Sequence, residues 1–155
     1  MNEYLEEAQE ELKRVDHIIY VSLKYTRTVD IIRNALHRML SACDFIVAGI
    51  LEHNKEQKKI KKLPDTPKQR IDLMRELYKD DKTVLRFITF YVFLRELIKV
   101  PFKKTEEYRR HVTMIAEFEN KTADVNIDTL EDNYDKMAKD FFAYAVILNE
   151  GIKDE

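Results

Sequence analysis

The chain has 155 residues, with 27 Lys and Arg against 29 Asp and Glu, a formal net charge of −2 and a hydrophobic fraction of 45%. This length and composition predict one folded domain over residues 1–155 that needs no disulfide or metal, and they exclude a disordered tail. Two Gly and three Pro also exclude fibrous chains and make an all-β fold improbable.

The first predicted helix runs from Tyr4 to about Leu23, because apolar residues recur there at intervals of three and four. A second helix begins after Thr28, whose hydroxyl suits an N-cap. Almost every residue from Phe45 to Leu51 is apolar, so we expect this helix to be surrounded by other helices. Gly49 inside it costs about 1 kcal/mol relative to Ala, which predicts either a close neighbour or a loosened helix.

A basic segment from Lys55 to Asp65 precedes a short helix that begins at Thr66-Pro67-Lys68-Gln69, a capping sequence with a first-turn proline. The next helix is predicted from about Lys82 to Lys99 and stops before Pro101. It is apolar on two sides, which is more than one neighbouring helix can cover. Its second apolar stripe consists of Phe90, Phe93 and Leu97.

After a predicted linker from Phe102 to Tyr108, apolar residues alternate with polar ones, which predicts a β-hairpin over about residues 110–128. Asp128 or Thr129 is expected to cap the last helix, which ends at Gly151. The predicted fold is therefore mainly α, an up-and-down bundle of four to five helices with a β-hairpin inserted before the last helix.

The sequence excludes several kinds of site. Phosphate-binding loops and dinucleotide cofactor sites need closely spaced glycines, and only Gly49 and Gly151 occur. None of the four histidines follows a Glu by three residues, as di-iron bundles require. The single Cys43 lies at an apolar helix position, so we expect no disulfide, no Cys-based zinc site and no reactive thiol. We therefore expect no cofactor and no metal.

Other features bear on the location and source of the protein. The single Cys favours an intracellular, cytoplasmic protein, and the acidic, polar N-terminal segment does not resemble a signal peptide. No apolar segment reaches the length of a membrane span. Charged residues make up 36% of the chain, with many Lys, Glu and Ile, which is typical of proteins from hot environments.

Three groups of residues are candidates for binding an anion or RNA. The segment from Lys55 to Arg70 has seven basic residues against two acids, although such a segment is more often a solvated surface. Arg109, Arg110 and His111 follow Tyr108, which offers charge beside a stacking ring, or else a charged edge strand that prevents aggregation. Arg33 and His37 are four residues apart on one helix face. The candidate residues are Lys58, Lys59, Lys61, Lys62, Arg109, Arg110, His111, Arg33 and His37.

Asp44 lies beside the most apolar part of the second helix. A buried aspartate there would have a perturbed pKa and could act as an acid or base. The alternatives are an ion pair that stabilises the fold, or a side chain that faces solvent, and we favour these.

Residues 3–52, from EYLEEAQEELKR to SACDFIVAGILE, resemble the opening antiparallel helix pair of HEPN-type domains. The resemblance implies a small helical bundle that often dimerises and that belongs with ribonucleases, toxins or RNA-associated proteins. Active members carry an Arg followed by four to six residues and a His. No Arg stands at these distances before any His, and Arg33 to His37 is one residue too short. The resemblance therefore implies a non-catalytic member, and the hairpin is a departure from the family.

The sequence thus predicts a non-enzymatic helical module that acts by association, as a homodimer or with a protein partner. Aromatic residues dominate such interfaces, and the interface candidates are Phe90, Phe93 and Leu97. The alternative is an RNA- or nucleotide-binding protein that uses basic residues at 55–62 and 109–111. A divergent ribonuclease based on Arg33 and His37 is a third and weaker reading.

Overall fold

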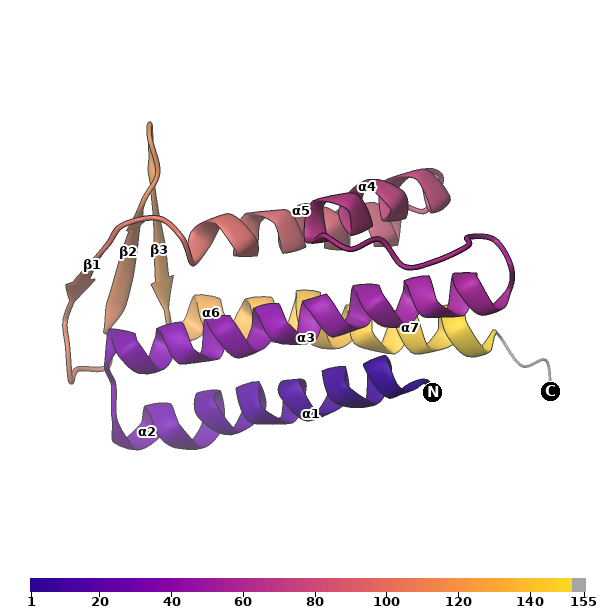
Figure 1. Ribbon diagram of the computed structural model, residues 1–155. Helices are drawn as coiled ribbons and strands as arrows, with labels where there is room; N and C mark the ends of the chain where they lie inside the picture. Colours follow the sequence, from indigo (N-terminus) through magenta and orange to yellow (C-terminus); the bar gives the residue numbers. More distant parts are fainter. Residues whose placement is uncertain (152–155) are drawn as a thin grey trace.

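The computed structural model describes residues 1–151, which are mainly helical with a three-stranded antiparallel sheet at one end (Figure 1). The helical elements are α1 (Glu3–His17), the π-helical segment η1 (Ile18–Ser22), α2 (Leu23–Tyr25), α3 (Val29–Glu56), α4 (Pro67–Leu77), α5 (Lys82–Leu97), α6 (Ile127–Asn133), the π-helical segment η2 (Tyr134–Lys139) and α7 (Asp140–Glu150). The strands are β1 (Phe102–Thr105), β2 (Thr113–Glu117) and β3 (Thr122–Asn126). Within residues 1–151, no helix combines the length and apolar character that crossing a membrane requires.

Helix α3 is the centre of the fold, as its apolar sequence predicts. It runs antiparallel to α1 and lies between α1 and α5 (Figure 1). Thr28 is its N-cap, because the Thr28 hydroxyl accepts a hydrogen bond from the Ile31 amide at 3.3 Å. The residues of α3 from Ile46 to Leu51 are all buried, so this part of the helix is covered by protein on every side.

Gly49 allows the start of α1 to approach α3 closely. A Cβ atom added to Gly49 would lie 2.8 Å from Cγ and Cδ2 of Leu5, which is buried. The carbonyl of Gly49 accepts hydrogen bonds from the side-chain amides of Asn2, at 2.9 Å, and Asn149, at 3.1 Å. Of the two alternatives from the sequence, the close neighbour is therefore correct, and α3 continues through Gly49 as an α-helix.

Helices α4 and α5 begin at sequence-encoded caps. Thr66 and Gln69 form the predicted capping box, with Pro67 as the first helical residue. Asp81 caps α5 by accepting from the Val84 amide at 3.1 Å. One side of α5 packs on α7, where the rings of Phe87 and Phe141 stack with centroids 3.9 Å apart. This contact is part of the core that holds α5 and α7 together.

The predicted β-hairpin is part of a larger sheet, so the hairpin interpretation was incomplete. The segment Phe102–Thr105, expected to be linker, forms β1 and pairs antiparallel with β2, with Phe102 opposite Ala116. Four residues are too few to show an apolar period. Phe102 is held by a tertiary contact, because the Arg33 guanidinium lies 4.1 Å from the centre of its ring.

The last helix begins earlier than predicted. Its N-cap is Asn126, whose side chain accepts from the Thr129 amide at 2.9 Å, while the Thr129 hydroxyl accepts from the Asn126 amide at 2.9 Å. Asp128 and Thr129 therefore lie in the first turn, and the expectation that either is the cap was wrong. The reciprocal pair of hydrogen bonds makes Asn126 the better cap. Gly151 is the C-cap, as predicted.

Two π-helical segments interrupt the long helices, and a tyrosine within each of them bonds the other helical region. Tyr20 in η1 donates to Glu131 of α6 at 3.1 Å. Tyr134 in η2 donates to Asp16 of α1 at 3.2 Å, and lies 3.3 Å from the carbonyl of Leu12. Apolar periodicity does not reveal the extra residue per turn, so the sequence predicted uninterrupted helices there.

Candidate nucleic-acid interface

The loop between β1 and β2, residues 106–112, is fixed to the junction of α2 and α3. The amide of Tyr108 donates to the carbonyl of Arg27 at 2.7 Å, and the carboxylate of Glu107 accepts from the Val29 amide at 3.0 Å. Glu106 and Tyr108 have φ angles of 54° and 65°, a left-handed conformation that residues other than glycine rarely adopt. The loop is therefore held in a defined and strained shape, with the ring of Tyr108 outward.

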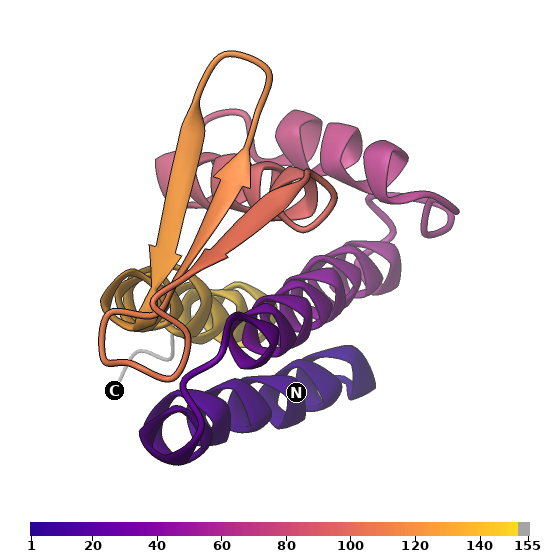
Figure 2. The same cartoon turned by 90° about the vertical axis from the view of Figure 1, so that its left-hand side faces the viewer.

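Two segments with exposed tyrosines and basic residues meet at the end of the molecule that faces the viewer in Figure 2: Tyr25 ends α2 and is followed by Arg27, and Tyr108 to His111 belong to the β1–β2 loop. Tyr25 and Tyr108 are the most exposed large apolar or aromatic side chains among the described residues, at 85% and 77%. Arg27, Arg110 and His111 line a pocket of about 100 Å³ together with the start of α6. We call this group the tyrosine-arginine end; it consists of Tyr25, Arg27, Tyr108, Arg109, Arg110 and His111.

The charges of the tyrosine-arginine end are only partly neutralised. Arg109 lies 3.7 Å from the carboxylate of Glu106, and its side chain is largely exposed. Arg27 donates to the carbonyl of Leu23 at 3.1 Å, which orients its guanidinium without neutralising it. Among residues 1–151, no carboxylate lies within 4 Å of the Arg110 guanidinium. Asp128 also lines the pocket, so its carboxylate would oppose the binding of an anion there.

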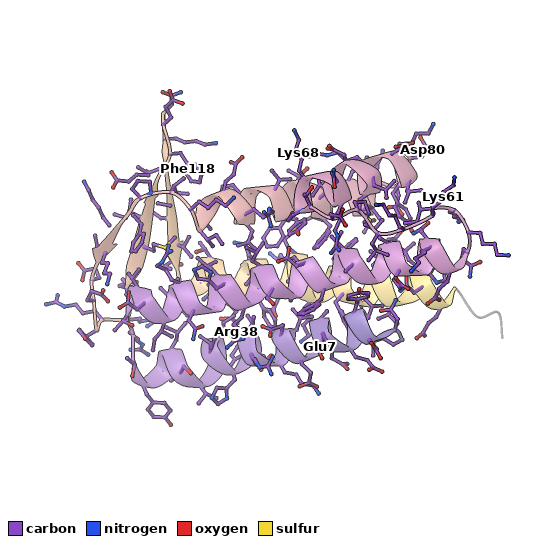
Figure 3. All side chains as sticks on the ribbon, viewed as in Figure 1. Glu7, Arg38, Lys61, Lys68, Asp80 and Phe118 are labelled. Atoms are coloured by element: carbon purple, nitrogen blue, oxygen red, sulfur yellow. The ribbon has the colours of Figure 1, made fainter. Side chains whose placement is uncertain are left out.

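The basic segment after α3 lies at the opposite end of the bundle, where Figure 3 labels Lys61. Helix α3 has 28 residues, so at about 1.5 Å per residue it separates the two ends by roughly 40 Å. The segment is ordered by partly buried Ile60 and Leu63, which pack against the core. Its candidate residues Lys58, Lys59, Lys61 and Lys62 are all exposed. The structure therefore does not bring them together with Arg109, Arg110 and His111.

Arg33 and His37 do not form a shared site. The Arg33 guanidinium donates to the carbonyl of Ile98 at 3.2 Å and covers the ring of Phe102. It thereby joins α3 to the end of α5 and to β1. His37 is exposed, and no hydrogen bond joins it to Arg33 among the described residues.

Asp44 is half-buried and satisfied by two partners. It accepts a short hydrogen bond from the hydroxyl of Tyr91, and Arg95 lies 3.6 Å away. Burial raises the pKa of Asp44, and Tyr91 and Arg95 oppose that rise. The pKa of the Tyr91 hydroxyl is also raised, by burial and by the Asp44 carboxylate. Asp44 is thus part of an ion pair and hydrogen bond between α3 and α5, as we favoured.

Cys43 is fully buried in α3, in agreement with its apolar sequence position. Burial raises the pKa of its thiol far above the ordinary value, and the neighbouring Asp44 carboxylate raises it further. A thiol of this kind stays protonated at neutral pH.

The three interface candidates on α5 differ in exposure. Leu97 is only 3% exposed and belongs to the core of the chain, because β3 and α6 cover this side of α5. Phe90 is partly exposed, and Phe93 is 40% exposed and stacks on Phe118 at 5.8 Å. Of the three residues predicted to form a protein–protein interface, only Phe93 and Phe90 are therefore accessible to a partner.

Tyr25 and Arg27 were not among the candidate residues from the sequence, because they lie in the break between the first two predicted helices. What could not be read from the sequence is that residues 106–112 fold back onto this break.

We compared the chain with protein-family models, with curated proteins and with solved structures, and none gave a significant match. The resemblance of residues 3–52 to HEPN-type domains stays a prediction. No group of three or more His, Cys, Asp or Glu side chains within residues 1–151 is arranged to hold a metal ion.

Proposed function

We propose that the protein binds single-stranded RNA through the tyrosine-arginine end and does not cleave it. The observation that carries this proposal is that Tyr25 and Tyr108, exposed at 85% and 77%, lie on two segments joined by the hydrogen bond from the Tyr108 amide to the Arg27 carbonyl, and that Arg27 and Arg110 of these segments line one pocket. Exposed aromatic rings stack on unpaired bases, and arginines bind the phosphates between them.

The shape of the loop supports the same proposal. The left-handed residues Glu106 and Tyr108 cost free energy, and the contacts with Arg27 and Val29 keep the loop in that shape. The small pocket lined by Arg27, Arg110 and His111 has room for a group of the size of a phosphate. A non-catalytic cytoplasmic HEPN-like protein would agree with this function.

The test is a titration of labelled single-stranded RNA, followed by fluorescence anisotropy at low and physiological salt. Three arginines that contact phosphates should give a log-log salt slope of about −2, because each phosphate contributes about −0.7. Replacing Arg110 by Ala should make the slope shallower by about 0.7 and weaken binding, while a denaturing gel shows intact RNA.

The basic segment supplies the control. Reversing the charge of Lys58, Lys59, Lys61 and Lys62 should leave the RNA affinity unchanged at physiological salt, since the distance of roughly 40 Å far exceeds the screening length of about 8 Å. If this variant loses binding while Arg110→Ala binds normally, the RNA site is the basic segment. If wild type binds at neither salt, the proposal is wrong.

Association as a homodimer is the second candidate function, favoured by the exposed Phe93 and its stacked neighbour Phe118. An aromatic pair on a surface that also includes Phe90 is the kind of anchor that interfaces use. A second copy of the chain would cover this surface across α5 and the sheet.

Phe93→Asp should convert such a dimer to a monomer, because a buried, unpaired carboxylate opposes association. Light scattering on a sizing column measures the result. Val21→Asp is the matched control, since Val21 is similarly exposed, at 41%, but lies in η1. A wild-type protein that stays monomeric at high concentration would exclude the homodimer.

A further inference from the structure

A groove of about 310 Å³ lies between α1 and α3. Five basic or uncharged polar residues line it, Lys13, Arg14 and His17 from α1 and Asn34 and Arg38 from α3, and the acidic Glu10 and the apolar Ile18 complete its walls. Figure 3 labels Arg38 where it extends from α3 toward α1. None of these five residues was a candidate site residue from the sequence.

The two arginines are held in place by one buried carboxylate. Glu11 is only 6% exposed, although it is charged, and its Oε1 accepts from Nη1 of Arg14 at 2.7 Å and from Nη1 of Arg38 at 3.4 Å. The guanidiniums themselves are about half exposed. Glu11 therefore orients both guanidiniums from the buried side of the groove. The remaining N–H groups of the two arginines are free to bind a molecule in the groove.

The charge balance favours an anion. The single carboxylate of Glu11 neutralises one of the two guanidiniums that share it, and Lys13 forms a separate pair with Glu10 at 3.2 Å. The groove and Glu11 thus carry three cationic side chains against two carboxylates, without counting His17. Two guanidiniums drawn to one oxygen atom would repel each other, and a second anion on their exposed side would relieve that repulsion.

We propose that the groove between α1 and α3 binds a phosphate group, with Arg14 and Arg38 as its principal ligands and His17, Asn34 and Lys13 at its edge. Guanidinium groups match the oxygens of phosphate in fork geometry, and arginines already oriented by an ion pair lose less freedom on binding. Inorganic phosphate and the phosphate of a small phosphorylated molecule share this chemistry. The site shares no residue with the tyrosine-arginine end.

The experiment is a titration of the isotope-labelled protein with sodium phosphate at constant ionic strength, followed by two-dimensional NMR of the backbone amides. We expect saturable shifts confined to residues 10–18 and 34–38 at millimolar phosphate. Equal shifts on adding sodium chloride alone, or no shifts in these two segments, would overturn the proposal and leave the arginines as a structural ion pair.

Arg38→Gln should weaken phosphate binding by about tenfold, since it removes a charge-assisted hydrogen bond. Arg75→Gln is the matched control, because Arg75 is also half exposed and lies 3.9 Å from a carboxylate, that of Asp72 in α4. If Arg38→Gln does not fold, Arg38→Lys keeps a charge for Glu11 but lacks the fork, and it should also weaken binding. Unchanged affinity in a folded Arg38 variant would refute the site.

A parallel titration with 5′-AMP and with adenosine identifies the source of the phosphate. Tighter binding of 5′-AMP than of phosphate at the same amides would indicate a phosphorylated small molecule, and equal binding would indicate inorganic phosphate. Shifts only at residues 106–112 would place 5′-AMP at the tyrosine-arginine end and, with no response of the groove to phosphate, would contradict the groove site. Adenosine should leave the groove amides unchanged.

Discussion

The double variant Tyr25→Ala and Tyr108→Ala is expected to bind single-stranded RNA about a hundredfold more weakly than wild type. Stacking of a base on an aromatic side chain contributes about 1–3 kcal/mol, and about 1.4 kcal/mol corresponds to tenfold in affinity. Two independent rings therefore account for the hundredfold loss. Both side chains are exposed, so neither truncation should affect folding, which circular dichroism checks.

The matching control replaces the same residues by phenylalanine. Phe keeps the aromatic face and lacks only the hydroxyl, and no hydrogen bond from either tyrosine hydroxyl occurs among the described residues. Tyr25→Phe with Tyr108→Phe should thus bind RNA almost as wild type does. An alanine double variant that binds as tightly as wild type would show that bases do not stack at this end.

Replacing Phe141 by Ala should lower the free energy of unfolding by about 3–5 kcal/mol, the range for removing a buried phenylalanine. Phe141 is buried and stacks face to face on Phe87, so the substitution leaves a cavity between α7 and α5. Urea unfolding followed by circular dichroism measures the loss. A loss of this size is a large fraction of the stability of a typical domain.

Phe142, the next residue, is the internal control because it is only partly buried at the surface of α7. Phe142→Ala should cost clearly less than Phe141→Ala. Equal losses, or a cost below about 1 kcal/mol at Phe141, would contradict the packing of α5 on α7. Phe141→Leu, which keeps most of the apolar volume, should fall between wild type and Phe141→Ala.

Much of the helical architecture could be predicted because its signals are local. Thr28 and Thr66 cap helices through hydrogen bonds within three residues, and the buried stretch of α3 is a continuous apolar run. One error occurred where residues distant in the sequence determine the local structure. Phe102 joins a strand because Arg33 and β2 hold it there. The misplaced start of the last helix is a local error, because Asn126 and Thr129 bond each other and the N-cap therefore lies two residues before Asp128.

The candidate site was predicted in part. Tyr108 to His111 were recognised as charge beside a stacking ring, because these residues are adjacent in sequence. Tyr25 and Arg27 are about 80 positions earlier in the chain, and tertiary contacts such as the hydrogen bond from the Tyr108 amide to the Arg27 carbonyl bring their segment to the loop. The groove between α1 and α3 was missed for the same reason, since Glu11 and Arg38 meet only when the two helices pack.

The sequence by itself determined a mainly helical fold, the order of its helices and the caps that begin α3 and α4. Only the tertiary structure shows which charged residues lie close together. Lys58 to Lys62 lie far from Arg109 to His111, Arg33 contacts the end of α5 and the sheet, and Arg14 and Arg38 both contact Glu11. The physical reason is range: caps and apolar periods depend on neighbours within a few residues, whereas the charge of a site depends on which helix faces meet.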